Sequence, residues 1–342
     1  MTANDFLRKA GRRRAARAWT LIAVLAVLVV VVFVVSMNSG FIRLSPLSVA
    51  KTLFGAGTDK EELILFELRL PRIVLSILIG AGLAISGCVL QGITRNPLAD
   101  PGILGINSGA GLMIAIVVAL YPELLGSSIF LLPCLALIGA LATAALLYLL
   151  ARKKGEGLSP TRLALVGIAL ASGISSAMIV LTMSLNPEQY QFVQNWLVGS
   201  ITGTSWKFVL AFLPWVVVLV PFVLYKAKTL NVLSLGDSLA TGLGMRTERE
   251  RVALLVAAVA LAGSCVAVGG GISFVGLVAP HLARQLVGSK HQALVPATAL
   301  TGALLVLAAD TVSRTSGMPT GIVVAVLGAP YFLYLLARAR SR

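Results

Sequence analysis

Residues of the kinds that catalyse reactions or bind metals are few in this chain. Two histidines, His281 and His291, are ten residues apart and have no third candidate ligand close by in the sequence. Zinc-type sites usually draw their ligands from tighter clusters. The cysteines Cys88, Cys134 and Cys265 lie in separate apolar runs, where a thiol packs as a small buried hydrophobic group. The sequence therefore predicts no metal site and no catalytic centre, and the chain is not expected to be an enzyme.

The glycines do not form a nucleotide site either. The sequence contains no G-x-x-x-x-G-K-[ST] motif of the kind that holds a nucleotide phosphate. The run Gly269-Gly-Gly271 lies between two apolar segments, and we expect it to be a break between membrane helices that is buried in protein. If the chain works with ATP, a partner must supply the ATPase.

Three arginines at the ends of apolar segments are candidates for binding. Arg69-Leu-Pro-Arg72 opens one segment, and Pro71 suits the first turn of a helix. Arg314 ends another segment, one turn after Asp310, so these two charges can pair. Two interpretations stay open. The arginines either extend to the membrane surface as solvated charges, or they dock an acidic partner.

Two other segments have a composition that calls for a defined shape. Asn96-Pro97 and Asp100-Pro101 place two turn signals within six residues, which predicts an ordered loop. The segment from Leu230 to Met245 is too short to span a membrane, and its leucines form an apolar face. Ser234 is predicted to cap a short helix, with Asp237 three residues on. This helix either lies on lipid or fits a groove in a cytoplasmic protein.

The elements that must position these residues are membrane helices. Of all residues 58% are hydrophobic and 12% are charged, and the mean hydropathy is +0.94. A soluble domain has about a quarter charged residues, so a soluble enzyme is excluded. The net charge of +15 does not indicate nucleic-acid binding, because the basic residues cluster at the ends of apolar runs.

The apolar runs predict an all-α polytopic membrane protein with about ten transmembrane helices, since a span needs roughly 20 residues. The predicted segments are 18–37, 71–92, 103–121, 127–151, 160–185, 206–226, 249–268, 272–287, 293–313 and 319–337. A further stretch at about 190–201 is too short to span and is predicted to be re-entrant. Glycines in 80–87 and at 105 and 109 suit close packing between helices.

The distribution of basic residues predicts the orientation. With ten spans, 21 of the 28 lysines and arginines fall on one side and seven on the other. Positive residues favour the cytoplasm, so both termini are predicted to be cytoplasmic. The expected organisation is a basic N-terminus at 1–17 and one transmembrane domain at 18–342, whose longest cytoplasmic connection is about 228–248. Charges within the spans are almost absent, which argues against proton coupling but leaves a sodium-coupled carrier open.

Together these motifs resemble the FecCD family, the permeases of ABC importers for iron-siderophore, haem and cobalamin. The resemblance covers about 41–337, in the order of the family. The stretches that carry it are Arg69-Leu-Pro-Arg72, Arg95-Asn-Pro-Leu-Ala-Asp-Pro-Gly102, Leu230–Met245, Phe274-Val-Gly-Leu-Val-Ala-Pro-His281, Pro319-x-Gly321 and Gly328-Ala-Pro-Tyr-Phe332.

Two stretches depart from the family pattern. This chain has Gly288-Ser-Lys-His-Gln292 where the family usually has Gly-x-Asp-His-Arg. It also has Gly317-Met-Pro319 where the family usually has a Glu two residues before Pro-x-Gly. Both departures lie in the last two loops, and both would fit pairing with a different second permease.

The resemblance implies a complex in the bacterial cytoplasmic membrane. Its parts are a second permease, the same chain or a paralogue, two ATPase subunits that hold ATP and magnesium, and an extracytoplasmic binding protein. This chain itself is expected to bind no cofactor and no nucleic acid. Ferric siderophore is the favoured cargo, with haem and cobalamin as alternatives.

The resemblance also implies roles for single residues. Arg69, Arg72 and Arg314 match arginines that meet paired glutamates of the binding protein. Asn96 and Leu98 resemble residues of the cytoplasmic gate, and Pro160 and Thr161 match a second constriction. The ATPase coupling residues implied by the match are Ser234, Leu235, Gly236, Asp237, Leu239, Gly242 and Gly244.

Overall fold

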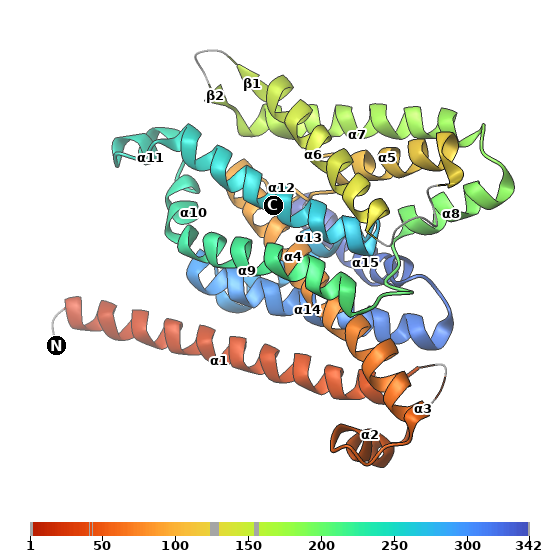
Figure 1. Cartoon of the computed structure of the whole chain (residues 1–342). Helices are drawn as coiled ribbons and strands as arrows, with labels where there is room; N and C mark the ends of the chain where they lie inside the picture. The colour runs from red at the N-terminus through yellow and green to blue at the C-terminus, as the bar shows by residue number, and fades with distance from the viewer. Residues whose placement is uncertain (1–2, 41, 43, 124–129, 154–156, 341–342) are drawn as a thin grey trace.

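The chain folds into a bundle of helices (Figure 1), seen in a computed structural model that describes residues 3–40, 42, 44–123, 130–153 and 157–340. The helices are α1 (Ala3–Asn38), α2 (Pro46–Leu53), α3 (Asp59–Glu62), the π-helical turn η1 (Leu63–Arg69), α4 (Leu70–Thr94), α5 (Ile106–Leu120), α6 (Leu131–Ala151), α7 (Pro160–Thr182), α8 (Pro187–Val198), α9 (Trp206–Tyr225), α10 (Ala227–Leu233), α11 (Asp237–Gly242), α12 (Thr247–Gly269), α13 (Val275–Val287), α14 (His291–Ser316) and α15 (Thr320–Arg340).

Each of the ten predicted apolar segments coincides with a helix. They are α1, α4, α5, α6, α7, α9, α12, α13, α14 and α15, although the first residues of the segment 127–151 lie outside the described residues. Within the described part, seven helices are long and apolar enough to cross a membrane. Three of the predicted segments lie on helices shorter than these seven, namely α5, the 320–333 part of α15, and α13. The stretch at about 190–201, which is predicted to be re-entrant, largely coincides with α8.

Two features differ from the prediction. The described chain is not wholly helical, because β1 (Arg152–Lys153) and β2 (Gly157–Leu158) pair antiparallel, with Arg152 opposite Leu158. The pairing leaves the residues before α7 on a short hairpin, which apolar periodicity does not reveal. The second difference is Cys134, which is exposed on α6, whereas Cys88 and Cys265 are buried as expected.

Prolines and caps set the points where several helices begin and end. Pro160 stands in the first turn of α7 after Ser159, where its missing N–H costs no hydrogen bond. Asn186 opens α8 and exchanges hydrogen bonds with Gln189 as a capping box. Arg95 ends α4 with a left-handed backbone, at a φ of 53°.

The core is built around α4, which packs against α14, α12, α13 and α9. Glycines allow the closest of these contacts. A Cβ on Gly80 would collide with the backbone of Gly302 in α14, and a Cβ on Gly87 would collide with that of Gly276 in α13. The predicted use of small residues for close helix packing is therefore confirmed for α4.

The glycine run after α12 is buried in protein, as predicted. The amide of Gly271 donates to the carbonyl of Trp196 at 3.2 Å, at the end of α8. A Cβ on Gly270 would lie only 2.5 Å from that same carbonyl oxygen. The break between α12 and α13 thus satisfies its backbone on α8, which a chain within a membrane requires.

The short elements gather at the two ends of the long helices. In Figure 1 the helices α10 and α11 and the β1–β2 hairpin lie at the left of the bundle, while α2, α3 and α8 lie at its right. The helix α1 runs along the outside and packs mainly on α14. The predicted cytoplasmic and outer segments are therefore sorted to opposite ends of the molecule.

Candidate functional site

The arginine motif begins where the π-helical turn η1 passes into α4. Arg69 is the last residue of η1, and Pro71 stands in the first turn of α4. Arg69 is only 5% exposed, and its guanidinium donates to the backbone carbonyls of Met37, in the last turn of α1, and of Ile42, just after α1. The interpretation of Arg69 as a solvated charge at the membrane surface therefore does not fit its burial and its two carbonyl partners.

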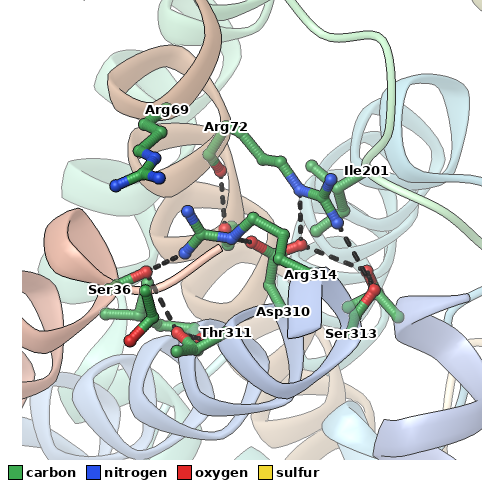
Figure 2. Close-up of polar contacts among 12 residues, drawn as sticks. Ser36, Arg69, Arg72, Ile201, Asp310, Thr311, Ser313 and Arg314 are labelled. Atoms are coloured by element: carbon green, nitrogen blue, oxygen red, sulfur yellow. Dashed lines mark hydrogen bonds and ion pairs between the residues drawn. The ribbon is translucent and has the colours of Figure 1, made fainter. Parts of the chain in front are cut away.

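Arg72 and Arg314 meet at one buried carboxylate (Figure 2). The Nε atom of Arg72 lies 2.8 Å from Oδ1 of Asp310, and the Nε atom of Arg314 lies 3.2 Å from Oδ2. Asp310 is fully buried. The predicted pairing of Asp310 with Arg314 is present, but Arg72 shares the same carboxylate.

Hydroxyl groups complete this outer network. Arg72 donates to Oγ of Ser313 at 3.3 Å, and Arg314 donates to Ser36 of α1. Thr320, at the start of α15, donates to Oδ1 of Asp310 at 3.2 Å. The network therefore joins α1, α4, α14 and α15 around a single acidic group.

A cavity of about 600 Å³ opens beside the three arginines. It is lined by Arg69, Arg72 and Arg314 together with polar side chains that include Asn195, Ser200 and Thr202. Among the residues that the structure describes, no carboxylate lines the cavity, and the acid that pairs with Arg72 and Arg314 is the buried Asp310. This cavity, which lies at the end predicted to face outward and is called the outer cavity below, thus has an excess of positive charge, which suits an acidic ligand.

The predicted loop after α4 has a defined shape. Oδ1 of Asn96 accepts the amide of Leu98 at 2.9 Å, and Oδ1 of Asp100 accepts the amide of Gly102 at 2.8 Å. Two side-chain turns therefore follow each other, as the two turn signals predict. Asn96 and Leu98 are half-buried in this chain.

Asp100 is a buried carboxyl group, and no basic residue of the described chain forms an ion pair with it. Burial raises its pKa to about 6, although backbone N–H donors at Gly102 and Ile103 lower it in part. Its Oδ2 atom packs near Gly276 of α13, where a Cβ would come within 2.7 Å. The loop is consequently sensitive to pH near neutrality.

The second predicted gate segment lies at the start of α7. Pro160 is half-buried and Thr161 is exposed. Further along the helix, Gly167 packs against Leu104, so that a Cβ on Gly167 would be 3.1 Å from the Leu104 Cα. The structure thus brings α7 against the residues that follow the Asn96 loop, while it places Pro160 and Thr161 near the hairpin.

The segment from Leu230 to Met245 is not one helix capped by Ser234. Ser234 ends α10, and its hydroxyl donates to the carbonyl of Asn231 at 2.6 Å. The chain turns at Gly236, whose φ is 105°, and Asp237 begins α11. The predicted capping box is therefore wrong, because the glycine places a break between Ser234 and Asp237.

The two short helices divide the leucines. Leu230 and Leu233 on α10 are buried against the bundle. Leu235, Leu239 and Leu243 are 55%, 62% and 68% exposed. The apolar face available to a partner is therefore restricted to α11 and its flanks, which also include the predicted Gly242 and Gly244.

Ion pairs that the sequence does not reveal hold this segment. Arg251 in α12 is buried and lies 2.6 Å from Oδ1 of Asp237 through its Nη2 atom. Arg95 lies 3.5 Å from the same oxygen. The positive φ of Arg95 is a consequence of its place after α4. The one feature of the sequence that hinted at these ion pairs was the position of Arg95 inside the loop motif.

The histidines have structural contacts. The ring of His281 packs edge-on against Tyr331. His291 is buried, and its Nδ1 atom lies 2.8 Å from Oδ1 of Asn231. Among the residues that the structure describes, no group of three potential metal ligands lies together.

Comparisons with known proteins match nearly the whole chain. Residues 28–338 match the family model of the FecCD transport family. The chain is 47% identical over 327 residues to the iron(3+)-hydroxamate import system permease protein FhuG of Bacillus subtilis (strain 168), covering 93% of this chain and 97% of FhuG. It is 44% identical over 328 residues to the Fe(3+)-citrate import system permease protein YfmE of the same organism, covering 95% and 96%.

The fold is also similar to a solved structure. A chain of an ABC transporter in an inward-facing conformation superposes with a TM-score of 0.81 and 32% sequence identity. The match covers 93% of this chain and 99% of that chain. The similarity therefore extends over the outer cavity, the loop after α4 and the short helices α10 and α11 together.

Proposed function

The chain belongs to the FecCD transport family and is a permease subunit of an ABC importer; we propose that its cargo is a ferric siderophore. The observation that carries the proposal is the full-length similarity to two permeases named for the import of iron(3+) chelates. A chelated iron arrives with its own ligands, so the permease needs no metal cluster of its own. Haem and cobalamin are the alternative cargoes.

The direct test uses the assembled importer. The chain is purified with its partner subunits in lipid nanodiscs, and ATP hydrolysis is measured with binding protein and one chelate at a time. Ferric hydroxamate or ferric citrate is expected to stimulate hydrolysis more than haemin or cobalamin. Stimulation by haemin or cobalamin alone would contradict the siderophore proposal.

We propose that the chain crosses the bacterial cytoplasmic membrane about ten times, with both termini in the cytoplasm. The uneven distribution of lysine and arginine supports this orientation. So does the sorting of α10, α11 and the hairpin to one end of the bundle. Helices of 13 to 15 residues, such as α5 and α13, would span about 20 Å, so their connections would complete the crossing.

The outer cavity is proposed to receive acidic side chains of an extracytoplasmic binding protein. Its three arginines and the lack of a lining carboxylate support this role. Arginine presents a planar fork to carboxylate that lysine does not. Association should weaken as salt rises, because the screening length is about 8 Å at physiological ionic strength.

The docking test replaces arginine by glutamine, because glutamate would place a second carboxylate beside Asp310. Arg69→Gln with Arg72→Gln should weaken association with the binding protein and lower cargo-stimulated hydrolysis, while basal hydrolysis persists. Lys207→Gln, an exposed basic residue that does not line the cavity, is the matched control. Unchanged association at low salt in the double variant would show that the cavity does not dock the binding protein.

The exposed leucines on α11 and its flanks are proposed to contact an ATPase subunit. Leu235→Asp with Leu239→Asp would place charge in an apolar contact, which is strongly unfavourable when it is buried without a partner. The ATPase should then fail to co-purify although the permease inserts. Thr241→Asp, at an exposed polar position on the same helix, is the control. Normal co-purification of the double variant would contradict the contact.

The cytoplasmic gate is proposed to include Asn96 and Leu98 together with Pro160 and Thr161. The two side-chain turns that fix the loop support a defined gate. In a background without Cys88, Cys134 and Cys265, a cysteine at 96 or 98 should cross-link to the second permease when the gate is closed. The yield should change with nucleotide. Free labelling in every state, without a cross-linked product, would rule out this gate.

The alternative from another class is a sodium-coupled secondary carrier that works alone. Reconstituted chain without any ATPase distinguishes the two. Uptake driven by a sodium gradient under these conditions would favour the carrier, whereas uptake that depends on ATP and the ATPase supports the importer.

A further inference from the structure

The buried guanidinium of Arg251 holds two elements at once. Arg251 lies on α12 and is 4% exposed. Its Nη1 atom donates to the carbonyl of Leu158 at 2.6 Å, and its Nη2 atom donates to Oδ1 of Asp237 at 2.6 Å. A single buried side chain therefore ties β2 of the hairpin to the first residue of α11.

Asp237 makes a second, longer contact. Nη2 of Arg95 lies 3.5 Å from the Oδ1 atom that Arg251 also contacts. Gly236 makes the approach possible, since a Cβ there would lie 3.2 Å from Nη1 of Arg95 and its φ is positive. One carboxylate oxygen thus stands between two guanidinium groups from different helix ends.

Arg95 and Leu158, the two groups linked to the Asp237 carboxylate, lie next to the segments proposed as the gate. Arg95 directly precedes Asn96 in the loop after α4. Leu158 lies two residues before Pro160, the first residue of α7. The Asp237 carboxylate consequently reaches the loop at 96–98 through Arg95, and the start of α7 through Arg251.

Burial makes the two contacts unequal. Arg251 has almost no exposed surface on which water could replace its partner, so its contact with Asp237 is costly to break. Asp237 and Arg95 have side chains that are 44% and 38% exposed, and a pair of this kind is weak and easily exchanged. The carboxylate is therefore fixed on one side and free to release on the other.

We propose that Asp237 is a positioning residue that joins α11 to both cytoplasmic gate segments, through Arg251 and through Arg95. The inference rests on the proposed ATPase contact and gate. It assigns the Asp237 carboxylate to contacts within this chain, through which it transmits the position of α11, and not to the contact with the ATPase. Release of Arg95 while Arg251 stays bound would free the loop at 96–98 as α11 moves.

The test measures hydrolysis and uptake separately in the complete importer. Asp237→Asn keeps an oxygen acceptor for Arg251 but removes the charge that holds Arg95. Co-purification of the ATPase and basal hydrolysis should persist, whereas uptake per ATP hydrolysed should fall at least about fivefold. Loss of the ATPase from the complex would show that Asp237 is a surface contact and would overturn the proposal.

A second variant removes the link from the other side. Arg95→Gln should lower uptake per ATP as Asp237→Asn does, and the double variant should be no worse than either single one. If the losses of uptake per ATP add up in the double variant, Asp237 and Arg95 do not act through one contact and the proposal is overturned. Glu250→Gln is the matched control. Glu250 also lies on α12 and forms an ion pair, at 2.7 Å with Lys226, but neither residue is next to a proposed gate segment.

Cross-linking distinguishes failure of the inference from failure of the proposed gate. With a cysteine at position 98, the cross-link of the wild-type complex should respond to nucleotide, and that of Asp237→Asn should not. An equal response in both would overturn the link while the gate stands. No response in the wild-type complex would overturn the gate and the link together.

Discussion

Two carboxylates in this permease each hold two arginines, at opposite ends of the bundle. Asp310, at the end proposed to face outward (the outer end), is fully buried and pairs with Arg72 and Arg314. Asp237, at the end proposed to face the cytoplasm (the inner end), has a 44% exposed side chain and pairs with Arg251 and Arg95. The same three-charge arrangement is fixed where it is buried and exchangeable where water reaches it. Burial, and not the count of charges, sets which end can rearrange.

The largest effect is expected from the outer carboxylate. Asp310→Asn would leave two largely buried guanidinium groups without a counter-charge, and we expect a loss of about 3–5 kcal/mol in the free energy of unfolding. Denaturant or thermal unfolding in detergent measures this loss. Ser313→Ala, which removes one hydroxyl from the same network, should cost only about 1 kcal/mol. Equal losses in the two variants would mean that Asp310 is not the centre of the network.

A third carboxylate sharpens the comparison, because Asp100 is buried and forms no ion pair with the basic residues that the structure describes. Its folded pKa of about 6 lies above the ordinary value of 3.8. Its contribution to stability is therefore complete below pH 4 and is lost as the pH rises through 6. We expect a decrease of about 2–3 kcal/mol between pH 4 and pH 8.

Asp100→Asn isolates this contribution, since asparagine keeps the Oδ1 atom that accepts the amide of Gly102. The difference in unfolding free energy between the wild-type chain and the variant should change with pH by the amount given. A constant difference across this range would show that the carboxyl group does not titrate near neutrality.

The inner carboxylate should matter less for stability than the outer one. In Asp237→Asn the amide oxygen still accepts from Arg251, and the half-exposed position admits water. We expect a loss of about 1 kcal/mol in the free energy of unfolding, measured as for Asp310. A loss as large as that of Asp310→Asn would remove the distinction between the two ends.

The smallest effect is expected from a neighbouring surface pair. Arg152 and Glu248 lie 3.4 Å apart, with side chains that are 55% and 48% exposed. Glu248→Gln should therefore change the free energy of unfolding by less than about 0.5 kcal/mol. Unfolding in low and in high salt checks this, and a clear loss at low salt alone would indicate a stronger pair than exposure suggests.

Helix positions were predictable from the sequence because apolar length is a local property. All ten predicted segments coincide with helices, and the prolines mark the starts of α4 and α7. The break at Gly236 was missed, because the leucine spacing favours one continuous helix and only the positive φ of that glycine divides it. The β1–β2 pair was missed since strands of two residues have no periodic signal.

The arginine motifs were visible in the sequence, but their partners were not. Asp310 and Arg314 are one turn apart, so that pair could be predicted. Arg72 and Asp310 are separated by 238 residues, and no spacing rule joins them. The same holds for Arg251 and Leu158, 93 residues apart, whose contact depends on how α12 packs beside the hairpin.

The contact between Gly80 and Gly302 limits how this permease can change shape. Moving α4 along α14 by one turn, about 5.4 Å, would bring Ser76 or Ala84 to a place that holds only backbone. The two helices are thus locked in register and must travel as a single rigid body. The helix α5 packs chiefly against α6 and α7. The stretch 95–105 joins the paired helices to α5, so any displacement of α4 reaches α5 together with that of α14.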